Sequence, residues 1–328
     1  MAKKDLLTER IVYKPFEYPE AHDYWLKQQQ AHWIHTEVPM MSDVNDWKQN
    51  LTKTEKNIIG SILKGFAQTE TVVNDYWTGL VTKWFRKPEI IAMATTFGAM
   101  ETIHAEAYSL LNEELGLDDF SEFMEDEATM AKIETLMDVR DSFNGEIDWH
   151  ERAKSLAIFS AFTEGVNLFS SFAVLLSFKM RNKLKGVGQI VEWSIRDESM
   201  HSDAGCWLFR TLLLEHPELN TPELEAAINE AALLSLKLEL DFIEKVYEYG
   251  DLEGCNKDDL IHFIKNRVNT KLGDLGYKPI VDNVDMTAVD RMKWFDHLSA
   301  GKQHTDFFAN RVTHYSKGPI EWDAAAIF

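Results

Sequence analysis

Two short stretches of the chain place a glutamate three residues before a histidine in an apolar setting. The first, "ETIHAEAY", contains Glu101 and His104, and the second, "RDESMH", contains Glu198 and His201. Residues i and i+3 of an α-helix lie on one face, so each pair presents a carboxylate and an imidazole in the same direction. Each pair can therefore bind a metal ion with two ligands.

The spacing alone is weak evidence. With 54 acidic residues among 328, chance places an acid three residues before roughly two of the 11 histidines, and three such pairs occur. The third pair is Asp259 and His262 in "KDDLIHF". It follows a polar helix start, so we interpret Asp259 as a solvated or capping acid.

The first two pairs stand out because a lone glutamate precedes each of them along the chain. Glu70 lies in "LKGFAQTETVV" before Glu101, and Glu164 lies in "IFSAFTEGVNLF" before Glu198. The order Glu, then Glu-x-x-His, is thus used twice. Four helices that supply two single glutamates and two such pairs form the ligand plan of dinuclear carboxylate bundles.

The charge balance of these residues also predicts two metal ions. Four buried carboxylates without counter-charges would protonate rather than stay ionised. Two divalent cations carry +4, which matches Glu70, Glu101, Glu164 and Glu198, while the two histidines are neutral ligands. Carboxylate and imidazole ligands suit iron or manganese. A single zinc ion would leave half of the carboxylates uncompensated.

Composition restricts the fold and the partners. The chain is 45% hydrophobic with only 8 prolines and 16 glycines, which favours one or two domains of long helices. A formal charge of −20 argues against nucleic acid and anionic membranes as partners. Two cysteines fit a reducing compartment, and neither a signal peptide nor a membrane-spanning apolar run is evident. We expect a soluble, cytoplasmic, all-α protein.

Helix signals position the candidate ligands. Thr52 and Glu55 form a predicted capping box, and Pro88 and Gly116 bound a second helix. The segment 149–182 is apolar nearly all round in its middle, which predicts a helix at the centre of a bundle. The acidic stretch 118–128 is expected to be a solvated connection. Further helices are expected over 23–35, 188–216, 221–250 and 256–272.

These motifs together resemble the small, radical-generating subunit of class I ribonucleotide reductase, from about Trp33 to the C-terminus. The resemblance implies a ferritin-like helical bundle with additional helices over 21–310, an N-terminal arm over 1–20 and a flexible tail over 311–328. It also implies two metal sites with some bridging glutamates. One site consists of Glu70, Glu101 and His104, and the other of Glu164, Glu198 and His201.

The resemblance assigns redox roles to further residues. Tyr108 matches the position of the family's stable tyrosyl radical and lies one helical turn beyond His104. Leu168 and Phe172 are candidate apolar walls for such a radical. Some relatives with a glutamate as first ligand, as Glu70 is here, instead hold the oxidising equivalent on a manganese-containing centre. Asp197 matches an aspartate that holds a metal-bound histidine and a tryptophan, here His104 and Trp33.

The C-terminal segment carries the remaining expectations. "DFFANRVTHY" resembles the family segment that ends in a relay tyrosine, here Tyr315. The last residues, "WDAAAIF", are expected to bind the large subunit, with Phe328 and Trp322 as anchors. Ala309 departs from the glutamate that relatives often carry six residues before the relay tyrosine.

The function expected from these features is to make, store and deliver a one-electron oxidant. The oxidant would pass to a large catalytic subunit that reduces ribonucleotides to deoxyribonucleotides. We expect a homodimer with a di-iron centre, and dimanganese or mixed manganese–iron centres are alternatives. A di-metal oxidase or hydroxylase acting on an apolar substrate is the first rival, and a ferritin-type storage protein is the second.

Overall fold

The computed structural model describes residues 4–117, 134, 137 and 148–299. Within these residues the chain is helical and has no strand, only an isolated bridge between Leu252 and Cys255. The prediction of an all-α fold is therefore confirmed. The principal helices are α1 (Pro19–Gln30), α2 (Met41–Asn45), α3 (Lys53–Asp75), α4 (Thr82–Trp84), α5 (Pro88–Leu115), α8 (Trp149–Ile158), α9 (Phe169–Met180), α10 (Lys185–Glu215), α11 (Pro222–Glu248), α12 (Lys257–Leu275), α13 (Met286–Arg291) and α14 (Lys293–Ser299).

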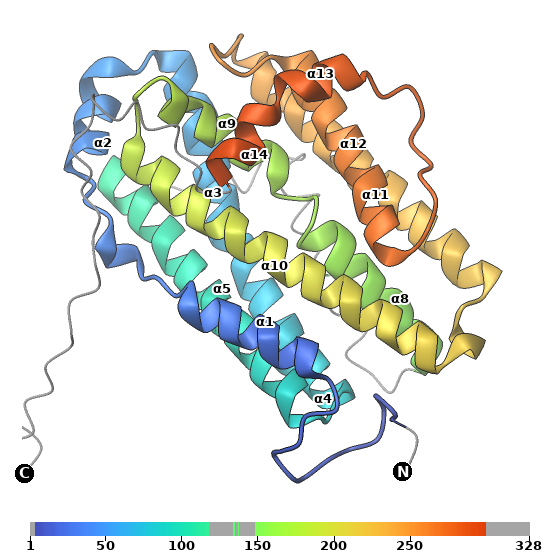
Figure 1. Ribbon diagram of the computed structural model, residues 1–328. Coiled ribbons are helices and arrows are strands. Elements are labelled where there is room, and N and C mark those ends of the chain that lie inside the picture. The colour runs from blue at the N-terminus through green and yellow to red at the C-terminus, as the bar shows by residue number, and fades with distance from the viewer. Residues whose placement is uncertain (1–3, 118–133, 135–136, 138–147, 300–328) are drawn as a thin grey trace, which may run out of the picture.

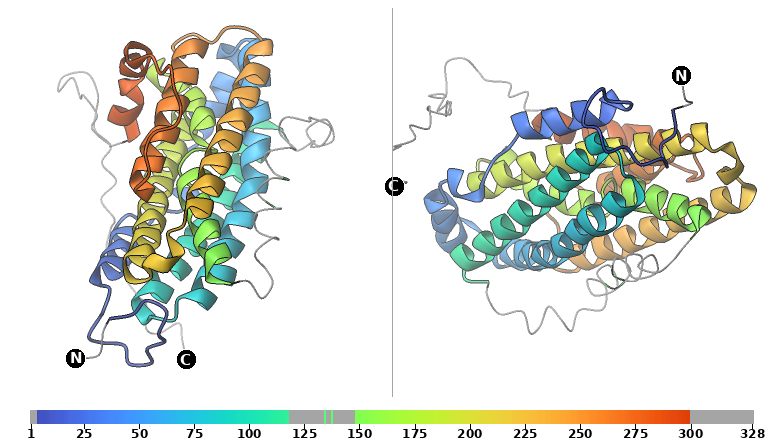
Figure 2. Two further views of the ribbon diagram at one scale, coloured as in Figure 1. Left: turned by 90° about the vertical axis from the view of Figure 1, so that its right-hand side faces the viewer. Right: turned by 90° about the horizontal axis from the view of Figure 1, so that it is seen from below.

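The helices form an elongated bundle around α10. In Figure 1, α10 crosses the middle of the molecule, with α1 and α5 on one side and α8, α11 and α12 on the other. Figure 2 shows that most of the helices run along the long direction of the bundle. Helix α3 packs along α5, and α9 packs along α10. This packing brings the glutamates of α3 and α5 to the side of α10 that carries Glu198.

Local sequence explains the ends of the helices that carry the ligands. The Thr52 side chain accepts a hydrogen bond from the Glu55 N–H, and the Glu55 carboxylate accepts one from the Thr52 N–H, at 3.1 and 2.8 Å. The predicted capping box is thus confirmed. Helix α5 begins at Pro88 and ends before Gly116, whose φ of 68° is left-handed. The predicted bounds of this helix are also confirmed.

The prediction of one continuous helix over 149–182 is wrong. Helix α8 changes into a π-helical turn at Phe159–Thr163, residues 164–168 form turns, and α9 begins at Phe169. The Glu164 N–H donates to the Phe159 carbonyl, a five-residue step that widens the helix. Gly165 interrupts the helix further, because its carbonyl accepts a hydrogen bond from the Arg267 guanidinium instead of a helical N–H. Glu164 therefore projects from a helix break.

The start of α10 is capped by a neighbouring helix instead of by its own side chains. Leu184 precedes the helix with a φ of 47° and makes no side-chain cap. The buried Asp43 of α2 instead accepts hydrogen bonds from the N–H groups of Gly186 and Val187, at 3.0 and 2.8 Å. A carboxylate at a helix N-terminus also interacts favourably with the helix dipole. This contact fixes the helix that carries Asp197, Glu198 and His201.

Asp43→Ala should lower the free energy of unfolding by about 2 kcal/mol, because two buried N–H groups lose their acceptor. Urea unfolding of the metal-free protein measures this change. Asp241→Ala is the control, since it removes an exposed ion pair with Lys237 and should change stability by less than about 0.5 kcal/mol. Equal effects of the two substitutions would rule out the capping role of Asp43.

The described part of the predicted N-terminal arm packs on the bundle. Leu6 and Tyr18 are fully buried. The acidic stretch 118–128 and the tail 311–328 lie outside the described residues, so the predicted division into arm, domain and tail stays a prediction. None of the described helices combines the length and the apolar character that a membrane span requires.

Candidate metal centre

The six predicted ligands meet in one buried cluster between α3, α5, α10 and the break after α8. Each has 2% or less of its surface exposed. Their ligand atoms form two overlapping groups, and within each group all of these atoms lie within 4.8 Å of one another. Glu101 and Glu198 belong to both groups. The first group also contains Glu70 and His104, and the second also contains Glu164 and His201.

Unsatisfied oxygen atoms show that this cluster fits a pair of cations. Within the described part of the chain, neither carboxylate oxygen of Glu70 accepts a hydrogen bond. One oxygen each of Glu101, Glu164 and Glu198 is also buried without a hydrogen-bond donor. Buried carboxylate oxygens are almost always hydrogen-bonded or bound to a metal. The donor set of oxygens and imidazole nitrogens is the one that iron and manganese prefer.

The contact between His201 and Glu101 is also close without being a well-formed hydrogen bond. Nδ1 of His201 lies 2.7 Å from Oε1 of Glu101, yet the two atoms are not aligned as a hydrogen bond. Nδ1 of His104 lies 3.0 Å from Oε2 of Glu101 and 2.9 Å from Oε1 of Glu198. Both imidazoles thus direct Nδ1 toward the shared carboxylates, which is the orientation that metal ligation requires.

Without metal ions the cluster must keep protons on its carboxylates. Burial, reinforced by the charge of Glu101, raises the pKa of Glu70 and of Glu198. Burial and Glu198 raise the pKa of Glu164. Burial acts in the same direction on Glu101, but the two neighbouring histidines outweigh it and lower the pKa of this carboxyl. The site therefore favours one ionised glutamate and protonated neighbours until cations replace the protons.

The outer nitrogens of both histidines are held by a buried polar network. Nε2 of His104 lies 3.2 Å from Oδ2 of Asp197, which also accepts a hydrogen bond from the Trp33 indole N–H at 2.7 Å. The amide N–H of Gln28 donates to the other oxygen of Asp197 at 3.0 Å, and Oε1 of Gln28 lies 3.2 Å from Nε2 of His201. The structure thus brings together the predicted residues Trp33, Asp197 and His104.

Sequence reasoning missed two residues of this centre. Gln28 joins the two histidine environments, but it lies in the polar run "KQQQAHW", where nothing distinguishes it from its neighbours. The Trp77 indole donates a 2.5 Å hydrogen bond to Oε1 of Glu164. Trp77 follows Glu70 by seven residues, two helical turns, and this spacing on the ligand face was an available signal.

Tyr108 is fully buried beside the cluster. Its ring centroid lies 6.5 Å from that of His104. Within the described residues its hydroxyl makes no well-aligned hydrogen bond, and the Ser194 hydroxyl is a polar group close enough to lower the pKa of the phenol. Burial, and next the charge of Glu70, raise the pKa of this phenol. The contacting wall is Phe66, at 4.8 Å, and the predicted wall Phe172 packs behind Phe66 at 5.1 Å.

Two other acid–histidine groups do not resemble this centre. The interpretation of Asp259 as a solvated or capping acid is wrong, because Asp259 is buried, accepts hydrogen bonds from the Arg291 guanidinium, and lies in a helix capped by Asn256. His262 accepts a hydrogen bond from the Asp285 N–H, so this third pair is structural.

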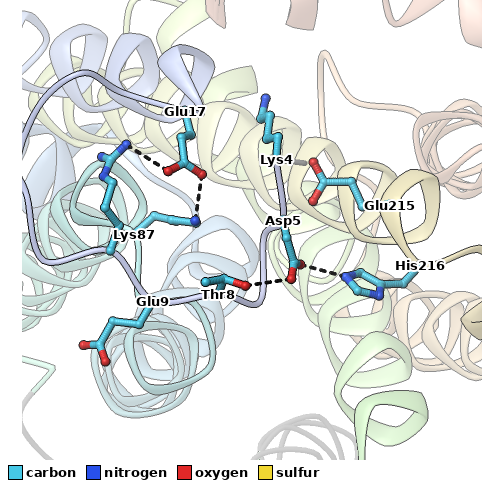
Figure 3. Close-up of a pocket in the computed structure, with 9 residues that line it drawn as sticks. Lys4, Asp5, Thr8, Glu9, Glu17, Lys87, Glu215 and His216 are labelled. Carbon is cyan, nitrogen blue, oxygen red and sulfur yellow. Dashed lines mark hydrogen bonds and ion pairs between the residues drawn. The ribbon is translucent and has the colours of Figure 1, made fainter. Parts of the chain in front are cut away.

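The second such group, Asp5, Glu215 and His216, lines a surface pocket (Figure 3). Its oxygens already accept hydrogen bonds from the Leu6 N–H, the Tyr18 hydroxyl and the Thr8 hydroxyl. These bonds attach the N-terminal segment to the end of α10, and no orphaned group in them indicates a metal.

Comparison with known proteins identifies the family. The family model described as "Ribonucleotide reductase, small chain" matches residues 10–284. The chain belongs to the ribonucleotide reductase small-chain family. It is 34% identical over 335 residues to a probable ribonucleoside-diphosphate reductase small subunit of Invertebrate iridescent virus 3, covering 97% of this chain and 87% of that one. It is 27% identical to a ribonucleoside-diphosphate reductase subunit beta of Chlamydia pneumoniae, covering 94% and 91%.

Solved structures share the fold of this small chain. A putative class I ribonucleotide reductase from Bacillus halodurans matches with a TM-score of 0.78 and 22% identity, covering 85% of this chain and 99% of that one. The dimanganese(II) NrdF of Streptococcus sanguinis matches with a TM-score of 0.73 and 22% identity, covering 87% and 99%. Family membership and the buried cluster together support a dinuclear metal site in this oxidoreductase subunit.

Metal binding to this small chain should release protons, because the pKa values of Glu70, Glu164 and Glu198 are raised in the metal-free site. The affinity for Mn²⁺ should therefore fall as the pH is lowered, by roughly tenfold per pH unit for each proton displaced. Calorimetric titration in two buffers of different ionisation enthalpy counts these protons. Glu198→Ala is the matched variant and should release fewer of them. Uptake of protons, or an affinity independent of pH, would contradict the raised pKa values.

Proposed function

We propose that this chain is the subunit of ribonucleoside-diphosphate reductase that generates and stores a one-electron oxidant. The observation that carries the proposal is the pair of overlapping ligand groups that share Glu101 and Glu198. In this proposal Glu70, Glu101 and His104 hold one ion, and Glu164, Glu198 and His201 hold the other. The shared residues Glu101 and Glu198 would be within reach of both ions.

A bound metal pair would supply the redox chemistry that, with an oxygen species, yields a one-electron oxidant. Two iron ions are our first choice for the pair. Dimanganese and mixed manganese–iron centres are the alternatives, and two observations favour testing them. One is that the first ligand is a glutamate, Glu70, and the other is that NrdF of Streptococcus sanguinis contains dimanganese(II).

Tyr108 is proposed to store the oxidant as a tyrosyl radical. The phenol would lose one electron and its hydroxyl proton. Its burial keeps water and reductants away from the ring, and Phe66 provides an unreactive apolar neighbour. A phenol with a raised pKa stays protonated at neutral pH, so the electron and the proton must leave together.

Trp33 and Asp197 are proposed to move the oxidant out of the core. Asp197 contacts both the Trp33 indole N–H and the His104 imidazole through the same oxygen. When Trp33 gives up an electron, its N–H proton can shift to Oδ2 of Asp197 and later return. The 2.7 Å hydrogen bond from the indole N–H to Oδ2 of Asp197 provides the path for that proton.

The partners are proposed from the family. We propose a homodimer, by analogy with the Rnr4 homodimer of Saccharomyces cerevisiae. We also propose that the tail binds the large catalytic subunit through Phe328 and Trp322 and relays the oxidant through Tyr315. These residues and Ala309 lie outside the described residues. A cytoplasmic location is proposed because Cys206 and Cys255 are free thiols.

The first experiment is an electron paramagnetic resonance spectrum of the metal-free protein loaded with ferrous iron and exposed to air. We expect a tyrosyl signal in the native chain and its loss in Tyr108→Phe, since phenylalanine cannot be oxidised in its place. Metal analysis of both samples is the control. A native sample with a bound metal pair but no tyrosyl signal would remove the storage role of Tyr108, and manganese loading would then be tested.

Deletion of residues 317–328 separates this function from the rival oxidase. The truncated chain should still bind metals and form the oxidant, but ribonucleotide reduction with the large subunit should be lost. A small-molecule oxidase would keep its full turnover after this deletion. Size-exclusion chromatography of the same samples distinguishes a dimer from the closed shell of a ferritin-type storage protein.

A further inference from the structure

Ser194 of α10 is fully buried, and within the described residues its hydroxyl makes no well-aligned hydrogen bond. A serine or threonine inside a helix can donate its hydroxyl proton to a carbonyl of the preceding turn. Ser177 of α9 does so, with 2.6 Å between its Oγ and the Val174 carbonyl oxygen. Thr211 of α10 does the same with the Trp207 carbonyl at 2.8 Å. The Ser194 hydroxyl makes no such bond and is therefore available to another group.

The packing of α5 against α10 decides which group faces Ser194 (Figure 1). Nδ1 of His201 lies 2.7 Å from Oε1 of Glu101. Nδ1 of His104 lies 2.9 Å from Oε1 of Glu198. A step of three residues forward along α5 thus corresponds to a step of three residues backward along α10. The two helices are therefore antiparallel at the ligand cluster.

One further helical turn in this register brings two hydroxyl groups together. Tyr108 follows His104 by four residues on α5, and Ser194 precedes Glu198 by four residues on α10. Residues four apart lie on one face of a helix, so the antiparallel order places Tyr108 opposite Ser194. The Tyr108 phenol is also fully buried without a well-aligned hydrogen bond in the described part of the chain. Buried hydroxyl groups are almost always hydrogen-bonded, so these two are each other's expected partners.

The electrostatics of the phenol agree with this placement. Burial raises the pKa of the Tyr108 phenol, and the Ser194 hydroxyl opposes that shift. A neighbouring O–H group has this effect when it donates to the phenol oxygen. Glu70, His104 and Glu198 also act on the phenol, but all three are proposed metal ligands. Ser194 has no such second role.

We propose that Ser194 is a positioning residue for Tyr108 and donates a hydrogen bond to the oxygen that stores the oxidant. The proposal rests on the proposed function, because that function gives Tyr108 its storage role. In the phenol, either hydroxyl can be the donor. In the tyrosyl radical the oxygen carries no proton and can only accept, so the donor must be the Ser194 O–H. Ser194 keeps its own proton in both states, and no covalent bond of its side chain changes.

The test compares three variants of the full chain. Ser194→Ala removes the hydroxyl and adds no atom, whereas Ser194→Thr keeps a hydroxyl on the same carbon. Ser177→Ala is the matched control, since it removes another fully buried serine hydroxyl, the one that bonds the Val174 carbonyl. Unfolding midpoints and metal content are measured for every variant, so that a structural effect of a substitution is visible.

The first measurement examines the radical by high-field electron paramagnetic resonance and deuterium double resonance, after iron loading and exposure to air in D₂O. The native radical should show coupling to an exchangeable deuteron. Ser194→Ala should lose this coupling, and the largest g value of its radical should rise, because a hydrogen bond to a phenoxyl oxygen lowers that value. Ser194→Thr and Ser177→Ala should keep the native spectrum. A coupling that is absent from the native radical, or that persists in Ser194→Ala, would overturn the proposal.

The second measurement does not depend on metal. Infrared spectra are recorded for metal-free protein labelled with ¹³C at the phenol carbon of tyrosine. Subtracting the spectrum of Tyr108→Phe in each background isolates the C–O stretching band of Tyr108. Ser194→Ala should shift this band, because the hydrogen bond to the phenol oxygen is lost, and Ser194→Thr and Ser177→Ala should leave it in place. An unshifted band in Ser194→Ala would overturn the hydrogen bond, whatever the metals do.

The two measurements separate the failure of each proposal. If the Tyr108 band responds to Ser194→Ala but no tyrosyl radical forms after metal loading, the hydrogen bond stands and the storage role of Tyr108 fails. If the radical forms while neither its spectrum nor the Tyr108 band responds to Ser194→Ala, the storage role stands and the role of Ser194 is overturned.

Discussion

The rest of this structure depends on one constraint: four glutamates lie close to one another in the interior. Few other charged groups lie within their reach. Three of these glutamates would stay protonated if the site held no cations, because burial and mutual repulsion raise their pKa values. The cost of desolvating such a cluster must be offset when cations bind. The fold therefore does not use the glutamates to hold itself together, and a large apolar core surrounds them instead.

Regular helices position five of the six candidate ligands, and an irregular segment positions the sixth, Glu164. Glu101 and His104 share a turn of α5, and Glu198 and His201 share a turn of α10, so helix geometry alone fixes each pair. Glu164 follows a π-helical turn and precedes a break, where the backbone is free of the helical repeat. Such π-helical turns are frequent at functional sites. Glu164 is also held by a hydrogen bond from the Trp77 indole N–H.

The parts of the site that follow from periodicity could be predicted from the sequence, and the parts that follow from packing could not. The two Glu-x-x-His pairs, the capping box at Thr52 and the helix stop at Gly116 are local patterns. The break at Glu164 was missed because the surrounding residues are apolar nearly all round, and the donor that satisfies the Gly165 carbonyl is Arg267, a hundred residues further on. Gln28 was missed for the same reason, since its partners Asp197 and His201 come from another helix.

In the proposed function, storage and delivery of an oxidant place opposite demands on the protein around it. The proposed storage site is Tyr108, whose phenol is buried and packs against Phe66. The proposed delivery path begins on the side of His104 that faces away from the glutamates, where Asp197 contacts both His104 and Trp33. The His104 imidazole lies between these two regions, with its Nδ1 toward the other metal-ligand candidates and its Nε2 toward Asp197. This division requires α5 and α10 to stay in register, and the Asp43 cap at the start of α10 contributes to that register from outside the site.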